Sequence, residues 1–141
     1  MKISEHFDES EFRCKCCGKL PPQFRDSEGE LTVCYQTLFD QLEDIRSAWG
    51  RPLRIKSGYR CSQHNSVVGG SPLSVHMFGL AVDLGFSSDN EVAKFIEVAR
   101  SVAPYMRRGW KMYVGKKFCH LDVADCIYPR PSENFVGGVE W

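Results

Sequence analysis

The chain has no excess of either charge and no long hydrophobic run. Its 141 residues include 18 basic and 18 acidic side chains, so the formal net charge at pH 7 is zero. A balanced charge gives no electrostatic reason to bind DNA or RNA. No apolar stretch approaches the roughly 18 residues that a membrane-spanning helix needs, so the sequence predicts no membrane span.

The start of the chain, Met1 to His6, also lacks the apolar stretch of a secretory signal. We therefore expect the protein to be cytoplasmic as synthesised. Internal repeats, low-complexity segments and linkers are absent from the sequence, and hydrophobic residues make up 43% of it. The length and composition predict a single domain over residues 1–141, and we expect a monomer.

Two stretches have the spacing of amphipathic helices. Between Leu31 and Trp49, apolar residues recur at intervals of three, four and seven, and Gly50 with Pro52 ends the pattern. Ser88-x-x-Glu91 is a capping box that opens a second helix, which Pro104 ends.

Strands are predicted at 53–57, 80–86, 110–114 and 118–123, with Gly115-Lys116-Lys117 joining the last two as a hairpin. Residues 1–30 are polar and rich in turn residues, which predicts an irregular N-terminal arm wrapped on the domain. Residues 129–141 predict a loop. Strands interleaved with helices, together with the hairpin, predict an α+β fold with a small antiparallel sheet flanked by helices.

The most informative motif is Ser74-x-His76-x-x-Gly79-x-Ala81-x-Asp83, with a further histidine at His120. Two imidazoles and one carboxylate can hold zinc with its fourth position open, as catalytic zinc sites do. Zinc in such a site activates a bound water. Alternation on the last predicted strand places His120 and Asp122 on one face and directs Cys119 into the core.

Seven cysteines are many for this length, and four of them lie early, at Cys14, Cys16, Cys17 and Cys34. In a cytosolic chain such a cluster indicates thiols or metal ligands before disulfides. The C-x-C-C spacing differs from the usual C-x-x-C knuckle, so plain thiols or an oxidised pair are favoured over a second, structural zinc ion. Cys61, Cys119 and Cys126 look scattered.

At these residues the chain resembles the zinc D-alanyl-D-alanine carboxypeptidases, in their small phage-type or C-terminal-domain form. The same superfamily includes LAS-type endopeptidases and the hedgehog signalling domain. The similarity covers nearly the whole chain. It is carried by Ser57-Gly58-Tyr59-Arg60, His64-Asn65, Val68 to Ser71, Ser74 to Asp83, Phe118 to Val123, a final Trp141, and an opening with Ser4 to Phe7 and Glu11 to Cys14.

The resemblance implies one zinc ion held by His76, Asp83 and His120. It also implies that Arg60 binds a substrate carboxylate or stabilises an oxyanion, which suits a planar guanidinium. Ser74 would bond near the metal or to the substrate. The alternatives are a surface salt bridge for Arg60 and a simple turn serine for Ser74.

The general base is the point where the sequence departs from the family. Larger relatives have an acidic residue three positions before the last zinc histidine, where this chain has Lys117. LAS-type relatives have a histidine two positions before it, where this chain has Phe118. Asp122 is the predicted substitute. It could instead hydrogen-bond an imidazole from behind, or only meet Arg60 or a lysine. His64 is another candidate for the base, with capping or pinning of the loop at 58–70 as its alternative.

The resemblance thus implies a metallopeptidase acting on peptidoglycan stem peptides, in a phage or prophage role or after release to the wall. Two other hypotheses remain open. One is a non-catalytic zinc-binding structural or binding module of the same fold. The other treats the early cysteines as a zinc or redox module for which the rest of the chain is the scaffold.

Overall fold

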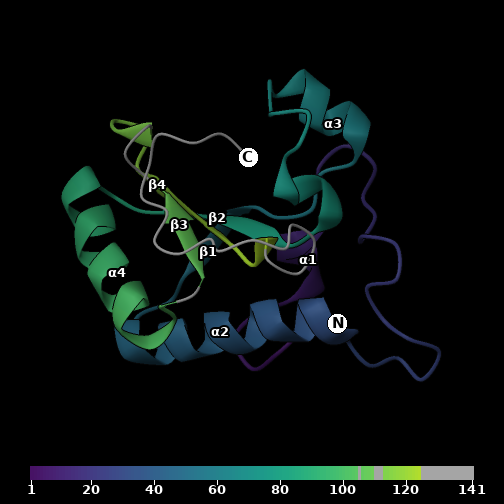
Figure 1. The fold of residues 1–141 in the computed structure, drawn as a ribbon, viewed down its shortest axis with the longest axis horizontal. Coiled ribbons are helices and arrows are strands. Elements are labelled where there is room, and N and C mark those ends of the chain that lie inside the picture. The colour runs from purple at the N-terminus through teal and green to yellow at the C-terminus, as the bar shows by residue number, and fades with distance from the viewer. Residues whose placement is uncertain (105, 110–112, 125–141) are drawn as a thin grey trace.

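The computed structural model describes residues 1–104, 106–109 and 113–124. In this part of the chain four strands form one antiparallel sheet in the order β1-β2-β4-β3. The strands are β1 (Arg54–Ser57), β2 (Ala81–Gly85), β3 (Arg107–Gly109) and β4 (Phe118–Asp122). The helices are α1 (Glu9–Phe12), α2 (Val33–Trp49), α3 (Ser62–Val67) and α4 (Asp89–Val102), with a 3-10 helix, η1 (Val75–Phe78). The predicted α+β fold with a small antiparallel sheet is confirmed (Figure 1).

The two long helices form where the sequence predicts them. In α2, the predicted stripe residues Leu38, Leu42 and Ile45 are fully buried, and Gly50 ends the helix with a φ of 74°. A left-handed residue in this place favours glycine. The helix α4 begins after Ser88, whose Oγ accepts a hydrogen bond from the Glu91 N–H at 3.1 Å. Local spacing and caps were therefore sufficient to locate both helices.

The first thirty residues contain one short helix, α1, and otherwise irregular backbone that packs on the domain. Asp8 and Glu11 form a reciprocal capping box around α1. Phe7, Phe12 and Phe24 are buried, and their rings lie 6.0, 5.1 and 6.5 Å from the ring of Phe39 on α2. Aromatic rings at these separations add to the stability gained by burial. The arm thus supplies part of the core rather than only covering it.

The predicted hairpin exists, but its first strand was placed too late in the chain. The strand β3 is Arg107–Gly109, whereas Tyr113 and Val114 belong to the turn that leads toward β4. Residues 110–112 lie outside the described part of the chain, as do Cys126, the predicted loop at 129–141 and the final Trp141. Pairing with β4 is what defines β3 in the described part of the chain.

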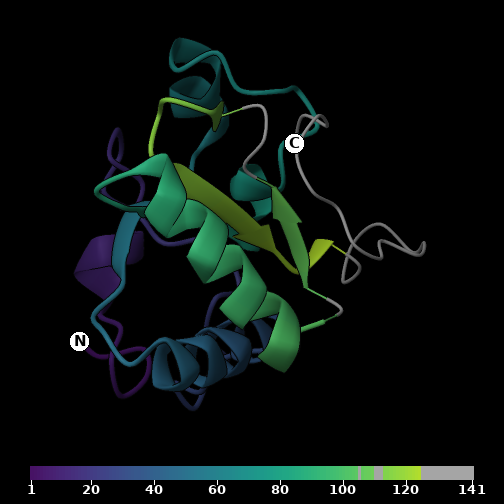
Figure 2. The same ribbon diagram turned by 90° about the vertical axis from the view of Figure 1, so that its left-hand side faces the viewer.

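Strand register brings the functional side chains to one face of the sheet. Asp83 on β2 pairs directly with His120 on β4, and Arg107 on β3 pairs with Asp122 on β4. Alternate residues of the same strands point to the opposite face, where the fully buried core residues are Val82, Leu84, Cys119 and Leu121. The helices α2 and α3 lie on opposite sides of the sheet (Figures 1 and 2).

Among the described residues, the longest helices are too short or too polar to cross a bilayer.

Candidate metal centre

His76 is held by the short helix η1 in front of β2. The Ser74 hydroxyl caps this helix by accepting the His76 N–H at 3.2 Å. Gly79 ends it with a φ of 71°, and the Gly79 N–H donates to the His76 carbonyl at 3.1 Å. The Arg60 N–H donates to the same carbonyl at 3.0 Å. The residues of the motif therefore fix the backbone of His76 from both ends.

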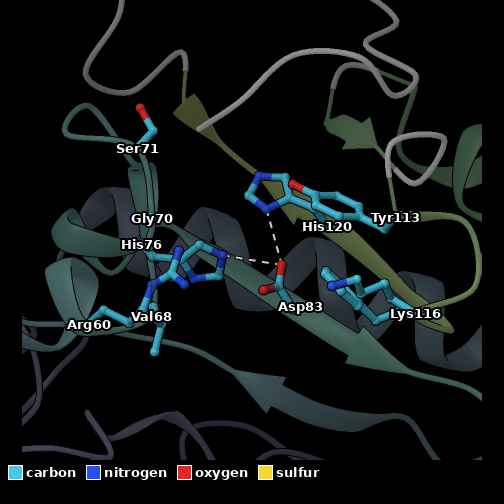
Figure 3. A pocket seen from close by; sticks show the side chains of 11 residues that line it. Arg60, Val68, Gly70, Ser71, His76, Asp83, Tyr113, Lys116 and His120 are labelled. Carbon is cyan, nitrogen blue, oxygen red and sulfur yellow. Dashed lines mark hydrogen bonds and ion pairs between the residues drawn. The ribbon is translucent and has the colours of Figure 1, made fainter.

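His76, Asp83 and His120 converge on one point (Figure 3). His76 Nε2 and His120 Nδ1 each lie 3.2 Å from Asp83 Oδ1. The ligand atoms of the three residues lie within 4.8 Å of one another, and all three side chains are buried. The residues that the sequence motif singled out as zinc ligands are thus brought together by a 3-10 helix and two paired strands.

In each imidazole, the outer ring nitrogen, which is the one that does not contact Asp83, has its own hydrogen-bond acceptor. His76 Nδ1 lies 2.8 Å from the Gly58 carbonyl oxygen, and His120 Nε2 lies 2.6 Å from Asp122 Oδ2. A carbonyl and an ionised carboxylate only accept, so these two nitrogens carry protons. In the neutral tautomers the lone pairs are then on His76 Nε2 and His120 Nδ1, beside Asp83. This is the arrangement that metal-binding histidines adopt.

Two carboxylates, Asp83 and Asp122, contact the His120 imidazole from its two ring nitrogens. Burial would raise the pKa of Asp83, but the charge of His76 and the hydrogen bonds from His120 and His76 hold it well below its usual value. Burial would lower the pKa of His120, but hydrogen bonds to Asp122 and Asp83 raise it to about 9. Carboxylates that stabilise a proton on an imidazole also attract a divalent cation to the same place.

Asp122 lies behind His120 rather than beside Asp83. It is fully buried, and Oδ1 accepts hydrogen bonds from Arg107 Nε at 2.8 Å and from the Ala124 N–H at 2.9 Å. Burial would raise its pKa, but His120 and Arg107 lower it, so Asp122 is ionised. In this placement Asp122 holds the His120 imidazole, which is one of the roles that the sequence left open for it.

Arg107 was not singled out from the sequence. It is 4% exposed, and its guanidinium also reaches Asp122 Oδ2 at 3.4 Å. The only signal for it would have been the β3 register, because Arg107 is opposite Asp122 across the sheet. Because the sequence predicts the strand at 110–114, it does not predict the pairing of Arg107 with Asp122.

A pocket of about 290 Å³ opens in front of the three converging side chains. It is lined by Arg60, Val68, Gly69, Gly70, Ser71, His76, Asp83, Tyr113, Lys116, Phe118 and His120 (Figure 3). Among these described residues Asp83 is the only carboxylate. His64, the other candidate for a general base, is not among these described lining residues.

Arg60, the predicted substrate-binding residue, lines the pocket together with His76, Asp83 and His120. Burial lowers the pKa of Arg60 and the charge of Asp83 raises it, and a guanidinium stays charged at neutral pH in either case. Its Nη2 donates to Ser74 Oγ at 3.1 Å, and its buried Nε has no hydrogen-bond partner among the described residues. Arg60 therefore keeps, at the wall of the pocket, an N–H group that no described residue accepts.

Ser74 is fully buried, and its hydroxyl accepts hydrogen bonds from both Arg60 and His76. It does not belong to the described pocket lining. Ser74 therefore holds the Arg60 side chain and the His76 backbone beside the metal centre, which corresponds to the first of the two roles predicted for it.

The segment that closes the pocket is fastened by Asn65. Asn65 Nδ2 donates to the Ser71 carbonyl at 3.0 Å. The backbone carbonyl of Asn65 accepts the Gly70 N–H at 2.9 Å. A Cβ on Gly70 would collide with the Asn65 side chain. The His64-Asn65 and Gly69-Gly70-Ser71 motifs are thus parts of one loop anchor.

The cysteines form a cluster with a different membership from the predicted one. The thiols of Cys14, Cys17 and Cys61 lie within 4.8 Å of one another. Cys34, predicted with the early cysteines, is instead on the first turn of α2, and Cys61 comes from the start of α3. Cys119 is fully buried in the core, as predicted.

Fold and site together define an α+β protein with a buried His-Asp-His centre that can hold a metal ion. The profile of the Peptidase M15 family matches residues 5–122, which is most of the chain. The chain belongs to the M15 peptidase family, whose members are zinc-dependent, and this membership supports a metallopeptidase. A separate comparison with curated proteins found no match.

Proposed function

We propose that the protein is a zinc metallopeptidase that hydrolyses amide bonds in the stem peptides of bacterial peptidoglycan, acting in a phage or prophage context. The observation that carries the proposal is the convergence of His76 Nε2, Asp83 Oδ1 and His120 Nδ1 at the floor of an open pocket. Family membership supports the metallopeptidase class. The choice of stem peptides rests on the resemblance carried by the Ser74 to Asp83 and Ser57 to Arg60 motifs.

The donor set fits zinc. Two neutral imidazoles and an ionised carboxylate are the ligands that catalytic zinc sites use, with the fourth position left to the pocket. The Gly58 carbonyl and the Asp122 carboxylate already hold the outer imidazole nitrogens, so the inner nitrogens are oriented before a metal binds. When bound, zinc would supply Lewis-acid polarisation of a carbonyl and activation of water.

The protein's own groups would bind and orient the substrate. Arg60 lies at the pocket wall beside His76, held by Ser74 (Figure 3). Its planar guanidinium can donate two parallel hydrogen bonds to a peptide carboxylate, or stabilise the oxygen on which negative charge develops. Arg107 and Asp122 keep His120 in one orientation, which preserves the geometry during the reaction.

Purified peptidoglycan is the substrate that tests the proposal. We expect the zinc-loaded protein to release new amino groups from wall fragments. We expect release to stop when a chelator removes the metal and to return when zinc is added back. Mass spectrometry of the products would identify the bond and separate a carboxypeptidase from an endopeptidase. Stoichiometric zinc binding without amine release would contradict the peptidase proposal.

One observation favours the second candidate, a non-catalytic zinc-binding module. Lys117 and Phe118 stand where relatives place a general base, and the described pocket lining contains no carboxylate other than Asp83. A module of this kind would bind wall fragments in a zinc-dependent way and leave them intact. The same peptidoglycan assay therefore distinguishes the two candidates.

The role of Asp122 can be tested separately with Asp122→Asn. We propose Asp122 as a positioning residue, since its carboxylate holds His120 Nε2. Loss of such a partner weakens zinc affinity by about 10–100-fold. The measurement is the zinc dissociation constant from competition with a chelator. The exposed Asp40 on α2, changed to asparagine, is the matched control and should leave the constant unchanged. A general base would behave differently, because zinc affinity would persist while kcat fell at saturating zinc.

A further inference from the structure

A second cluster of metal-ligating side chains lies away from the His-Asp-His centre. Cys14 and Cys17 come from one tight turn in the N-terminal arm, and Cys61 comes from the position just before α3. Their thiols are within 4.8 Å of one another. Four sulfur ligands around zinc lie about 3.8 Å apart when each zinc–sulfur distance is about 2.3 Å. Only a small contraction is therefore needed to place the three thiols around one ion.

The backbone around the cluster is arranged to stabilise thiolates. Cys14 Sγ accepts hydrogen bonds at 3.4 Å from the N–H groups of Cys16 and Cys61. Cys61 Sγ accepts the His64 N–H at 3.4 Å and so caps α3. Gly18, with a φ of 72°, closes the turn by donating its N–H to the Cys14 carbonyl at 2.9 Å. Backbone N–H groups directed at sulfur favour the anionic form that binds metal.

The electrostatics agree with this geometry. Burial would raise the pKa of the Cys14 thiol, but the backbone N–H groups of Cys61, Cys17 and Cys16 outweigh it and lower the pKa to about 7. Cys16 is exposed and lies in the same turn as Cys14 and Cys17, and desolvation together with the other three cysteines raises the pKa of its thiol. Its thiol is not one of the three that lie within 4.8 Å of one another, so it would have to turn toward them to become the fourth ligand.

We propose that Cys14, Cys16, Cys17 and Cys61 hold a second, structural zinc ion. Four thiolates make a closed tetrahedral site, which is typical of structural zinc and leaves no position for a substrate. The C-x-C-C spacing would be poor for a site built from the early turn alone. With Cys61 as a ligand from a distant segment, the turn has to supply only three of the four donors.

The proposed ion would fasten the arm to the substrate-binding segment. The Tyr59 N–H donates to the Phe12 carbonyl at 3.0 Å, and the Cys61 N–H donates to Cys14 Sγ at 3.4 Å. Arg60 lies between these two attachments, and α3 with its pocket-closing loop follows directly. A metal bridge between residues 14–17 and Cys61 would therefore keep Arg60 and the loop in place relative to the sheet.

Metal content of the full chain, purified under reducing conditions without chelator, tests the proposal. We expect two zinc ions per chain in the unaltered protein, and one in His76→Ala. We also expect one in Cys17→Ser and one in Cys61→Ser, where serine keeps a helix-capping oxygen. Cys34→Ser is the matched control, since Cys34 lies outside the cluster, and should keep two.

Cobalt provides a readout that does not depend on the cysteine variants folding. We expect His76→Ala loaded with Co²⁺ to show thiolate-to-cobalt charge transfer and the intense visible bands of a tetrahedral site. A single zinc ion that disappears with His76→Ala would overturn the proposal, as would two ions retained in Cys17→Ser. A disulfide among these cysteines in the reduced preparation would overturn it as well. Unchanged zinc affinity in Cys16→Ser would remove Cys16 from the ligand set.

Discussion

His120→Ala is expected to abolish zinc binding at the His-Asp-His centre and to reduce peptidoglycan hydrolysis by about a thousandfold or more. Only His76 and Asp83 would remain as donors, and two side-chain ligands hold zinc poorly. A catalytic metal contributes several kcal/mol to transition-state stabilisation, and each 1.36 kcal/mol is a factor of ten in rate.

The fold should survive this substitution. Asp122 keeps its ion pair with Arg107 at 2.8 Å, so removing the imidazole does not leave an unpaired buried carboxylate. The ladder between β2 and β4 is made by backbone groups and is unaffected. Thermal unfolding of the variant should therefore show one cooperative transition.

Zinc per chain and the rate of amine release are the measurements. His64→Ala is the matched control for metal content, because His64 lies on α3 outside the described pocket lining, and it should keep all its zinc. A His120→Ala protein that lost no zinc and kept its activity would show that the centre has been assigned to the wrong residues.

Gly79→Ala is expected to lower the free energy of unfolding by about 2–5 kcal/mol. Gly79 has a φ of 71°, which costs an L-residue roughly 1–2 kcal/mol. A Cβ there would also overlap the Cγ and Cβ of Pro21 and lie 3.3 Å from Tyr35 Cε1. Forced overlap in a packed region adds about 1–3 kcal/mol. The glycine of the His-x-x-Gly motif is therefore required by packing as well as by backbone conformation.

Gly50→Ala separates the two contributions. Gly50 has nearly the same φ, 74°, but nothing lies within 4 Å of a Cβ placed on it. This control should lose only the conformational part, roughly 1–2 kcal/mol. Denaturant unfolding followed by circular dichroism gives both values. Equal losses in the two variants would mean that Pro21 does not restrict position 79.

The helices and the metal-binding residue types were predictable because their signals are local. The stripe Leu38, Leu42 and Ile45 and the Ser88 cap each depend on residues within a few positions of one another, and both helices form there. Phe39 lies four residues after Tyr35 and three before Leu42, so it fits the same helical spacing. The spacing does not reveal that Phe39 packs against aromatic residues of the arm.

The strand β3, in contrast to the helices, is not predicted by local signals in the sequence. Arg107-Arg108-Gly109 has little strand propensity, yet both arginines are buried, at 4% and 0% exposure. Arg107 is paired with Asp122, and Arg108 Nη1 donates to the Ala103 and Met106 carbonyls at 3.1 and 2.6 Å. These partners are supplied by the sheet register and by the segment after α4, so propensity alone could not place the strand.

The sequence by itself determined which metal-binding side chains are present, because the types of the donor residues and their short-range spacing follow directly from it. This applies to His76 and Asp83, which lie in one motif, and to Gly79, which ends the short helix that holds His76. Only the tertiary structure decided that Asp122 holds His120 from behind, and that Cys61 rather than Cys34 joins Cys14 and Cys17. The physical reason is that strand pairing and loop packing join segments far apart in the chain, and small changes in register move a side chain to another partner.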